Sequence, residues 1–256
     1  MADRATILRE LHEAAEILVL ANVWDAASAR AVAAVDGVRA LATAGHSIAA
    51  AHGYEDGENI PLDLHLAAVE RVVAATELPV SMDFESGYGD PGETTRRALA
   101  AGAVGANLED GMRPLGEAVA AVEAVVAARE SEGTGFVLNA RTDAFLVAAE
   151  PDVETVAEAA ERGRAFLDAG AECVFVPRVR QVAHIEALVG ELGERRLSVI
   201  ASPGAPAAAE LERLGVARVS MGPWSYRAAL TALQDAAAQM VGGGAFPDDV
   251  RADALP

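Results

Sequence analysis

Three short polar clusters in the chain contain residue types that could carry chemistry. Asp83 and Glu85 lie in the segment Met-Asp-Phe-Glu-Ser-Gly-Tyr-Gly-Asp, Glu109 lies in Asn-Leu-Glu-Asp-Gly, and Arg141 lies in Asn-Ala-Arg-Thr-Asp. Each cluster follows a run of apolar residues that is typical of a buried strand. Residues two apart on an extended strand point to the same face, so Asp83 and Glu85 should lie together. We therefore expect three carboxylates to converge where neighbouring strands end.

Three carboxylates turned inward would destabilise the fold without a positive partner, because they repel one another and lose their hydration. The residues leave two partners open. One is a divalent cation: oxygen ligands with no neighbouring His or Cys suit Mg²⁺ or Mn²⁺ better than zinc. The other is Arg141, which could neutralise the group in a structural ion-pair network. Arg141 could instead bind a substrate carboxylate through its two-pronged guanidinium.

The segment Thr-Ala-Gly-His-Ser (43–47) could also contribute to a site. Its small residues leave backbone N–H groups that could form a concavity for an anion. His46 could act as a general acid, although a lone loop histidine more often has no such role, and the other four histidines receive no role. The single cysteine, Cys173, lies in Cys-Val-Phe-Val and is expected to be a buried core residue.

Composition excludes several classes of function. All twenty basic residues of this 256-residue chain are arginine, so an imine formed on a lysine amine is excluded. The formal net charge of −19 argues against a nucleic acid or an anionic membrane as partner. We found no signal segment and no apolar run long enough to span a bilayer, and we expect a cytoplasmic protein that acts on a small molecule.

The elements that must position the polar clusters alternate regularly between apolar strands and amphipathic helices. The predicted strands are Ile17–Ala21, Val38–Thr43, Val80–Phe84, Val104–Leu108, Phe136–Ala140, Cys173–Val176, Ser198–Ala201 and Arg218–Met221. The predicted helices are Ala5–Glu16, Ala26–Val35, Leu62–Thr76, Glu93–Ala101, Leu115–Glu132, Val153–Ala169, Val182–Leu192, Ala207–Leu214 and Tyr226–Met240.

Eight such units in one chain predict a single (β/α)8 barrel over residues 1–241, followed by a tail at 242–256. An open doubly wound sheet is the alternative. In a barrel of this kind the active site forms at the carboxyl ends of the strands, where all three polar clusters lie.

Short motifs in a fixed order extend this pattern along nearly the whole chain. They are Ala-Asn-Val-Trp-Asp-Ala-Ala-Ser-Ala-Arg (21–30), Thr-Ala-Gly-His-Ser (43–47), Asp56, Asp-Phe-Glu-Ser-Gly-Tyr-Gly (83–89), Leu-Glu-Asp (108–110), Asn-Ala-Arg-Thr-Asp-Ala (139–144) and Val-Ser-Met-Gly-Pro (219–223). Their joint order and spacing resemble the isocitrate lyase and phosphoenolpyruvate mutase superfamily.

The resemblance implies a barrel of the phosphoenolpyruvate/pyruvate-binding type that uses Mg²⁺. Asp83 would bind the cation directly and contact the substrate, while Glu85 and Glu109 would hold the water molecules of the cation. Glu85 stands where many members carry aspartate, which keeps the charge but changes the reach of the side chain.

The resemblance also assigns the groups that bind the substrate. The carboxylate of a 2-oxo acid would meet the backbone amides of Gly45 and His46, in a segment that includes Ala44. Arg141 matches the substrate-binding arginine, and Asp56 matches an aspartate on a gating segment that touches the substrate or a reactive water. Members commonly form tetramers that exchange the last helix, so we expect a homotetramer or homodimer in which 226–240 is exchanged.

The bond that is broken depends on the loop after the fourth strand, and this loop departs from the family patterns. Residues 109–117 read Glu-Asp-Gly-Met-Arg-Pro-Leu-Gly-Glu, without the Lys-Cys-Gly-His of isocitrate-type lyases or the longer lysine-containing loop of phosphomutases. Pro177, Arg178 and Ser198 also depart from the lyase pattern. The half of the site that serves the metal is therefore present, and the half that is specific to one reaction is not.

Three functions remain open at this point. The first is a Mg²⁺-dependent lyase that acts on a small 2-oxo or 2-hydroxy (di)carboxylic acid, by C–C cleavage or decarboxylation through a metal-stabilised enolate, with Asp56 and Arg141 as catalytic residues. The second is a mutase or hydrolase of the P–C bond of a phosphonopyruvate-like substrate, to which Arg113 would add a cation. The third is a non-catalytic protein that binds a 2-oxo acid.

Overall fold

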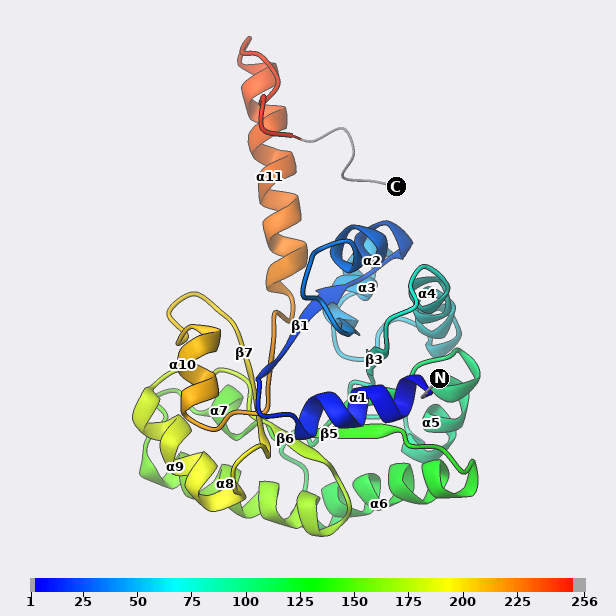
Figure 1. Ribbon diagram of the computed structural model, residues 1–256, viewed down its shortest axis with the longest axis vertical. Coiled ribbons are helices and arrows are strands. Elements are labelled where there is room, and N and C mark those ends of the chain that lie inside the picture. Colours follow the sequence, from blue (N-terminus) through cyan, green and yellow to red (C-terminus); the bar gives the residue numbers. More distant parts are fainter. Residues whose placement is uncertain (1–2, 251–256) are drawn as a thin grey trace.

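The computed structural model describes residues 3–250, which form a closed barrel of eight parallel strands in sequence order (Figure 1). The strands are β1 Leu18–Val23, β2 Leu41–Thr43, β3 Val80–Asp83, β4 Gly105–Glu109, β5 Val137–Arg141, β6 Cys173–Phe175, β7 Leu197–Ile200 and β8 Arg218–Ser220. All eight predicted strands are present, and β8 pairs with β1 to close the barrel. The predicted (β/α)8 barrel is confirmed, and the open sheet is wrong.

Eleven helices surround or extend the barrel in the described part of the chain. They are α1 Arg4–Glu13, α2 Ala26–Ala33, α3 Gly45–Ala51, α4 Leu62–Ala74, α5 Pro91–Ala100, α6 Leu115–Ser131, α7 Ala144–Val147, α8 Val153–Asp168, α9 Val182–Leu192, α10 Ala208–Arg213 and α11 Trp224–Val241. Two of them, α3 and α7, were not predicted. Both are short: α3 begins two residues after the end of β2 and α7 begins three residues after the end of β5, at the edge where the polar clusters lie.

In β3, β4 and β5 apolar residues alternate with polar ones toward the carboxyl end, as Met82 does with Asp83 and Ala140 with Arg141. Phe84 is fully buried in the layer between strands and helices, where its ring packs on Phe136 with ring centres 5.8 Å apart. Helix α1 packs at the amino-terminal end of the barrel: buried Leu8 joins Leu18 and Val137 in one apolar cluster. The opposite, carboxyl-terminal end is left for the polar clusters.

The barrel interior is polar where it approaches this carboxyl-terminal end. The amide of Asn139 donates to Asn107 Oδ1 at 2.8 Å, and the buried guanidinium of Arg218 donates to the same oxygen at 3.1 Å. Burial lowers the pKa of Arg218 to about 10. Arg218 has no carboxylate partner among residues 3–250, so an unpaired cation lies in the barrel below the acidic residues.

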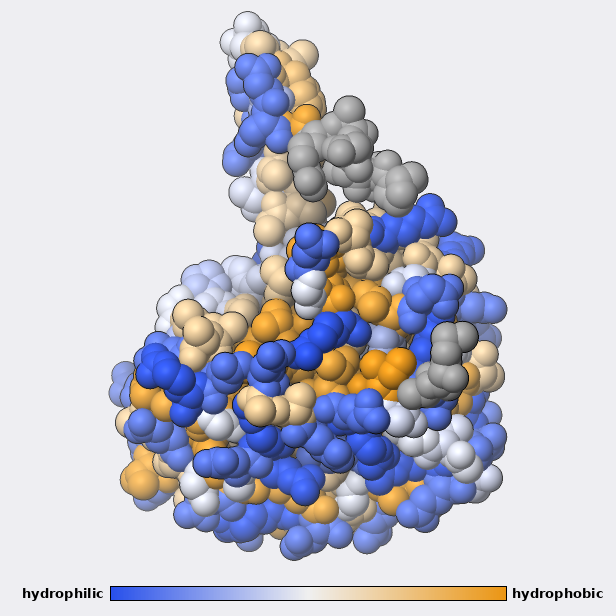
Figure 2. All heavy atoms as spheres, viewed as in Figure 1, coloured by the Kyte–Doolittle hydropathy of each residue, from blue (hydrophilic) through white to orange (hydrophobic). Residues whose placement is uncertain are grey.

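Helix α11 projects away from the barrel, and only Ala236 within it is buried (Figure 1). Figure 2 shows apolar residues gathered on the barrel surface below α11, in the region of β1, where Val19 is 49% exposed. Residues 251–256 of the predicted tail lie outside the described residues. Among residues 3–250, no helix has the length and apolar character needed to cross a bilayer.

Candidate active site

A cavity of about 540 Å³ opens at the carboxyl ends of the strands. Its lining includes all but one of the predicted site residues: Ala44, His46, Asp56, Asp83, Glu85, Glu109 and Arg141. The exception, Gly45, lies directly behind the lining, where its backbone N–H donates to Asp83 Oδ2 at 2.9 Å. Residues from five separate parts of the chain therefore meet at one site.

Asp83 and Glu85 reach the cavity from the end of β3. Asp83 is the last residue of the strand, and its backbone N–H donates to Thr43 Oγ1 of β2 at 3.1 Å. Glu85 follows in a turn with a φ of 53°, which is uncommon for a residue other than glycine. A side chain at position 45 would place its Cβ 1.9 Å from Glu85 Oε1, so Glu85 can keep this position only beside a glycine.

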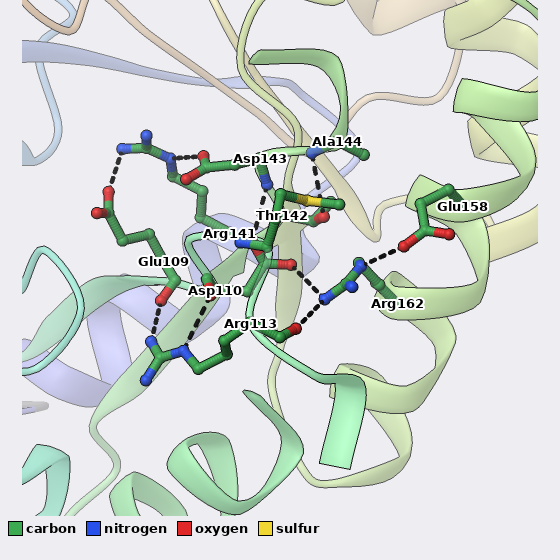
Figure 3. A network of polar contacts seen from close by, with 10 residues as sticks. Glu109, Asp110, Arg113, Arg141, Thr142, Asp143, Ala144, Glu158 and Arg162 are labelled. Atoms are coloured by element: carbon green, nitrogen blue, oxygen red, sulfur yellow. Dashed lines mark hydrogen bonds and ion pairs between the residues drawn. The ribbon is translucent and has the colours of Figure 1, made fainter. Parts of the chain in front are cut away.

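Glu109 and Arg141 lie opposite each other because β4 and β5 pair in that register. Arg141 Nη1 lies 2.7 Å from Glu109 Oε2, and Arg141 Nε donates to Asp143 Oδ1 at 2.6 Å (Figure 3). The second terminal nitrogen, Nη2, has no hydrogen-bond partner among residues 3–250. Arg141 thus neutralises Glu109 and keeps one nitrogen for a ligand. It forms no ion pair with Asp83 or Glu85, so the structural network accounts for only part of the cluster.

Burial and nearby negative charge shift the pKa of two carboxyl groups. Burial is the main cause at Glu85; together with the charges of Asp83, Asp56 and Glu109, and against the opposing charge of Arg141, it raises the pKa of Glu85 to about 9. Burial likewise raises the pKa of Glu109 to about 7, although Arg141 opposes the shift. Glu85 therefore holds a proton at neutral pH, which a divalent cation would displace.

The donor set fits Mg²⁺ in its chemistry, because every acidic group that lines the cavity offers oxygen atoms only. The described chain contains no group of three or more Asp, Glu, His or Cys side chains that are placed to hold a metal ion together. Direct binding by Asp83, with water molecules between the cation and Glu85 or Glu109, needs no such enclosure.

A network of buried polar groups supports the Glu109–Arg141 pair from behind (Figure 3). Asp110 accepts hydrogen bonds from the backbone N–H groups of Met112 and Asp143, both at 3.0 Å, and pairs with Arg162 of α8 at 3.1 Å. Arg113 points into this network and donates to the backbone oxygens of Glu109 and Asp110. The expectation that Arg113 adds a cation for the substrate is therefore wrong, because its guanidinium fixes the loop and does not line the cavity.

The segment that carries Asp56 is fastened to the loop that carries Glu85. Glu58 has a φ of 65°, and its Oε1 accepts hydrogen bonds from Ser86 N, Ser86 Oγ and Tyr88 N at 3.0, 2.8 and 2.7 Å. The hydroxyl group of Tyr88 lies 2.8 Å from Nδ1 of the fully buried His65. Sequence reasoning gave Glu58 and His65 no role, because neither belongs to a spacing pattern.

Three arginines that sequence reasoning also missed line the outer part of the cavity. Arg178 and Arg180 precede α9, and Arg227 lies in the first turn of α11. All three side chains are exposed. The cavity lining therefore carries three positive side chains in addition to Arg141. No sequence pattern indicated these arginines, since they are far from the strand ends of the acidic clusters.

The fold is a closed (β/α)8 barrel with acidic residues and an arginine at the carboxyl ends of its strands. A family model described as phosphoenolpyruvate phosphomutase matches residues 8–241. The chain belongs to this family, within the isocitrate lyase and phosphoenolpyruvate mutase superfamily of lyases and mutases.

Three relatives show how the similarity is distributed. An uncharacterized protein of Mycobacterium tuberculosis is 31% identical over 94% of this chain and 91% of its own length. An oxaloacetate decarboxylase of Pseudomonas paraeruginosa is 28% identical over 90% of this chain and 82% of its own. A crystal structure from Burkholderia cenocepacia J2315, described provisionally as a phosphonomutase, is 42% identical over 91% of this chain and 98% of its own, with a TM-score of 0.87.

Proposed function

We propose that the chain is a Mg²⁺-dependent lyase of small 2-oxo or 2-hydroxy diacids, working in the cytoplasm as a homo-oligomer. It would cleave a C–C bond, either between two carbon fragments or by decarboxylation. The observation that carries this proposal is the cavity in which Asp83, Glu85 and Glu109 meet beside Arg141 at the ends of β3, β4 and β5. Paired negative and positive groups of this kind suit an acid that is bound through a cation.

The acidic residues would hold the cation at the inner end of the cavity. Asp83 would bind it directly, and Glu85 and Glu109 would fix its water molecules. A divalent cation there would supply positive charge to the 2-oxygen of the substrate, on which negative charge develops as the bond breaks. In a decarboxylation the bond from C3 to its carboxyl group breaks, its electron pair stays with the remaining 2-oxo acid, and CO₂ leaves.

The other predicted residues would bind the substrate and move the proton. Arg141 would donate from its free Nη2 to the substrate carboxylate. Of the two amides expected to bind this carboxylate, that of Gly45 already donates to Asp83, so His46 would supply the contact. Asp56 would place the water or proton donor that returns a proton to C3. The oxaloacetate decarboxylase among the relatives supports chemistry of this kind, which requires no cysteine in the loop after β4.

Cleavage of a P–C bond is the second candidate, and one observation favours it. The exposed arginines at the outer cavity supply the additional positive charge that a phosphonate dianion needs. The relative described provisionally as a phosphonomutase is consistent with this reading. A protein that binds a 2-oxo acid without turnover is the third candidate.

A thermal-shift screen of small 2-oxo and 2-hydroxy acids, run with Mg²⁺ and with a chelator, distinguishes the candidates. We expect a diacid to stabilise the protein only with Mg²⁺ and to be converted to a shorter acid or to CO₂. Release of phosphate or a rearranged product from phosphonopyruvate would favour the second candidate. A stabilising ligand that is recovered unchanged would favour the third. Stabilisation by acids that persists in the chelator would contradict the proposed role of the metal.

A further inference from the structure

Acidic and basic side chains occupy different parts of the cavity wall. The four acidic residues of the lining, Asp56, Asp83, Glu85 and Glu109, come from the β3 and β4 ends and the loop before α4. Three of the four arginines lie elsewhere, as the rim arginines Arg178, Arg180 and Arg227. The molecule as a whole has 39 acidic and 20 basic residues, so three arginines around one opening run against its overall charge.

The rim arginines are not engaged in ion pairs with any acidic residue of the described chain. Many other arginines are: Arg4, Arg9, Arg39, Arg96, Arg97, Arg129, Arg141, Arg162 and Arg164 all have a carboxylate partner. In a chain with excess acid, positive side chains that face a cavity and have no carboxylate partner among residues 3–250 are available to an anionic ligand.

The protein also restricts how these side chains move. Arg178 has a left-handed backbone with a φ of 65°, and its Nη1 donates to the backbone oxygen of Leu146 in α7 at 2.9 Å. Val179 is buried between the two exposed arginines and anchors their segment. On the other side, the Arg227 guanidinium lies 4.9 Å from the centre of the Trp224 ring. Guanidinium groups held in this way lose less freedom when they bind an anion.

The charge balance of the lining indicates what kind of ligand fits. Its four carboxylates and four guanidinium groups cancel, so a bound divalent cation would leave two positive charges in the cavity. A ligand with one carboxylate would neutralise only half of this excess. A dianion would neutralise it fully, and a dianion whose anionic groups are separated by a carbon chain can place one group at the inner end and the other at the rim.

We propose that the rim arginines bind a second anionic group on the side chain of the substrate, which restricts this site to dianionic 2-oxo or 2-hydroxy acids. This inference rests on the proposed function, because the first carboxylate must be held at the inner end. The second group is a carboxylate or a phosphonate, which present the same acceptor oxygens to arginine. Monocarboxylic acids such as pyruvate or lactate fill only the inner part of the site.

Calorimetric titration with three ligands in the presence of Mg²⁺ tests the inference. Oxalate occupies the inner end alone, whereas lactate and malate differ by the second carboxylate. We expect the wild-type protein to bind malate at least about tenfold more tightly than lactate. The triple variant Arg178→Gln, Arg180→Gln, Arg227→Gln should lose this preference while its affinity for oxalate is unchanged.

A matched control is Arg30→Gln, since Arg30 is exposed on α2, has no ion pair in the described chain and does not line the cavity. This variant should keep the preference for malate. In a second series, phosphonopyruvate replaces malate. If the triple variant loses more affinity for phosphonopyruvate than for malate, the rim binds a phosphonate. If it loses more affinity for malate, the rim binds a carboxylate.

Two failures are distinguishable. If the wild-type protein does not bind oxalate in a Mg²⁺-dependent manner, the proposed function fails. If oxalate binds but the triple variant keeps full preference for malate and full affinity for phosphonopyruvate, the inner site stands and the inference about the rim arginines is overturned. Unchanged thermal unfolding of the triple variant shows that its fold is intact.

Discussion

Glu85 shows how the acidic site is held together at the scale of single residues. Its backbone is left-handed, and its carboxyl group is buried beside Asp83. The carboxyl group fits there because Gly45 has no side chain. Left-handed backbone at a residue other than glycine costs about 1–3 kcal/mol, and persists only where the surroundings enforce it. Folding therefore strains the backbone of Glu85 and disfavours the charged form of its carboxyl group. A bound cation would offset the cost of that charge.

The pH dependence of stability tests this arrangement. The pKa values of Glu85 and Glu109 in the folded protein are about 9 and about 7, both above the ordinary value of 4.5. Both groups are protonated in either state below pH 4.5, so their contribution to stability is fully present there. As pH rises toward 9, the unfolded chain releases these protons first, and the contribution is lost.

We therefore expect the chelator-treated protein to melt at progressively lower temperature between these pH limits, and Mg²⁺ to offset the loss. Thermal unfolding of the wild type and of Glu85→Gln measures this effect, and the variant should show a shallower slope. Glu123→Gln, a change at an exposed glutamate of α6, is the control and should leave the slope unchanged. A metal-free protein whose melting temperature rises over the same interval would contradict the raised pKa of Glu85.

At the scale of elements, loops fasten the site residues to one another. Glu58 joins the segment of Asp56 to the turn of Glu85 through three hydrogen bonds to a single oxygen. Hydrogen bonds to a charged group each contribute about 1.5–3 kcal/mol. Loss of the Glu58 carboxylate should let both loops move, and so displace Asp56 and Glu85 in the cavity.

We predict that Glu58→Ala lowers kcat/KM and Mg²⁺ affinity by about tenfold or more, because the preorganised site is loosened. Glu58→Gln keeps an acceptor oxygen and should recover much of both quantities. Glu55→Ala removes an exposed carboxylate from the same segment that makes no hydrogen bond within residues 3–250, and should change neither. An alanine variant with wild-type Mg²⁺ affinity would show that Glu58 does not position the site.

The elements that sequence analysis predicted well are those with a repeated signal. Every strand was found, because apolar runs between Gly and Pro residues recur eight times. Helix α3 was missed because its N-cap residue, Ala44, makes no side-chain capping hydrogen bond, and its seven residues are too few to show a period. Helix α7 has only four residues.

The residues of the candidate site also divide into those that a repeated pattern predicts and those that it does not. The residues at strand ends were predictable, since parallel strands of a barrel deliver them to one end. The rim arginines were not, because Arg178 depends on a left-handed turn, and Arg227 depends on how α11 leaves β8. The role of Arg113 was mistaken for a similar reason: its direction is set by the backbone oxygens of Glu109 and Asp110.

At the scale of the whole molecule, α11 is the element that its own barrel does not use. Leu230, Leu233 and Met240 are 40, 65 and 49% exposed on it. Burial of such side chains against a partner subunit would be favourable. The exchange of this helix in a homodimer or homotetramer remains a prediction.

Light scattering of the purified protein measures the assembly directly. We expect an oligomer that Leu233→Glu weakens or dissociates, because the charge would be buried in the exchanged helix. Gln234→Glu adds the same charge at the neighbouring exposed position and serves as the control. A wild-type protein that is monomeric at all concentrations would contradict the prediction.

The central claim is that Asp83, Glu85 and Glu109 bind a divalent cation. Calorimetric titration of the metal-free protein with Mg²⁺, in the presence of oxalate, tests it most directly. We predict one site that is lost in Asp83→Asn, in which the hydrogen bond from Gly45 can be kept, and retained in Asp168→Asn, a change at an exposed residue of α8. The absence of Mg²⁺ binding in the wild type, or equal binding by Asp83→Asn, would contradict the account.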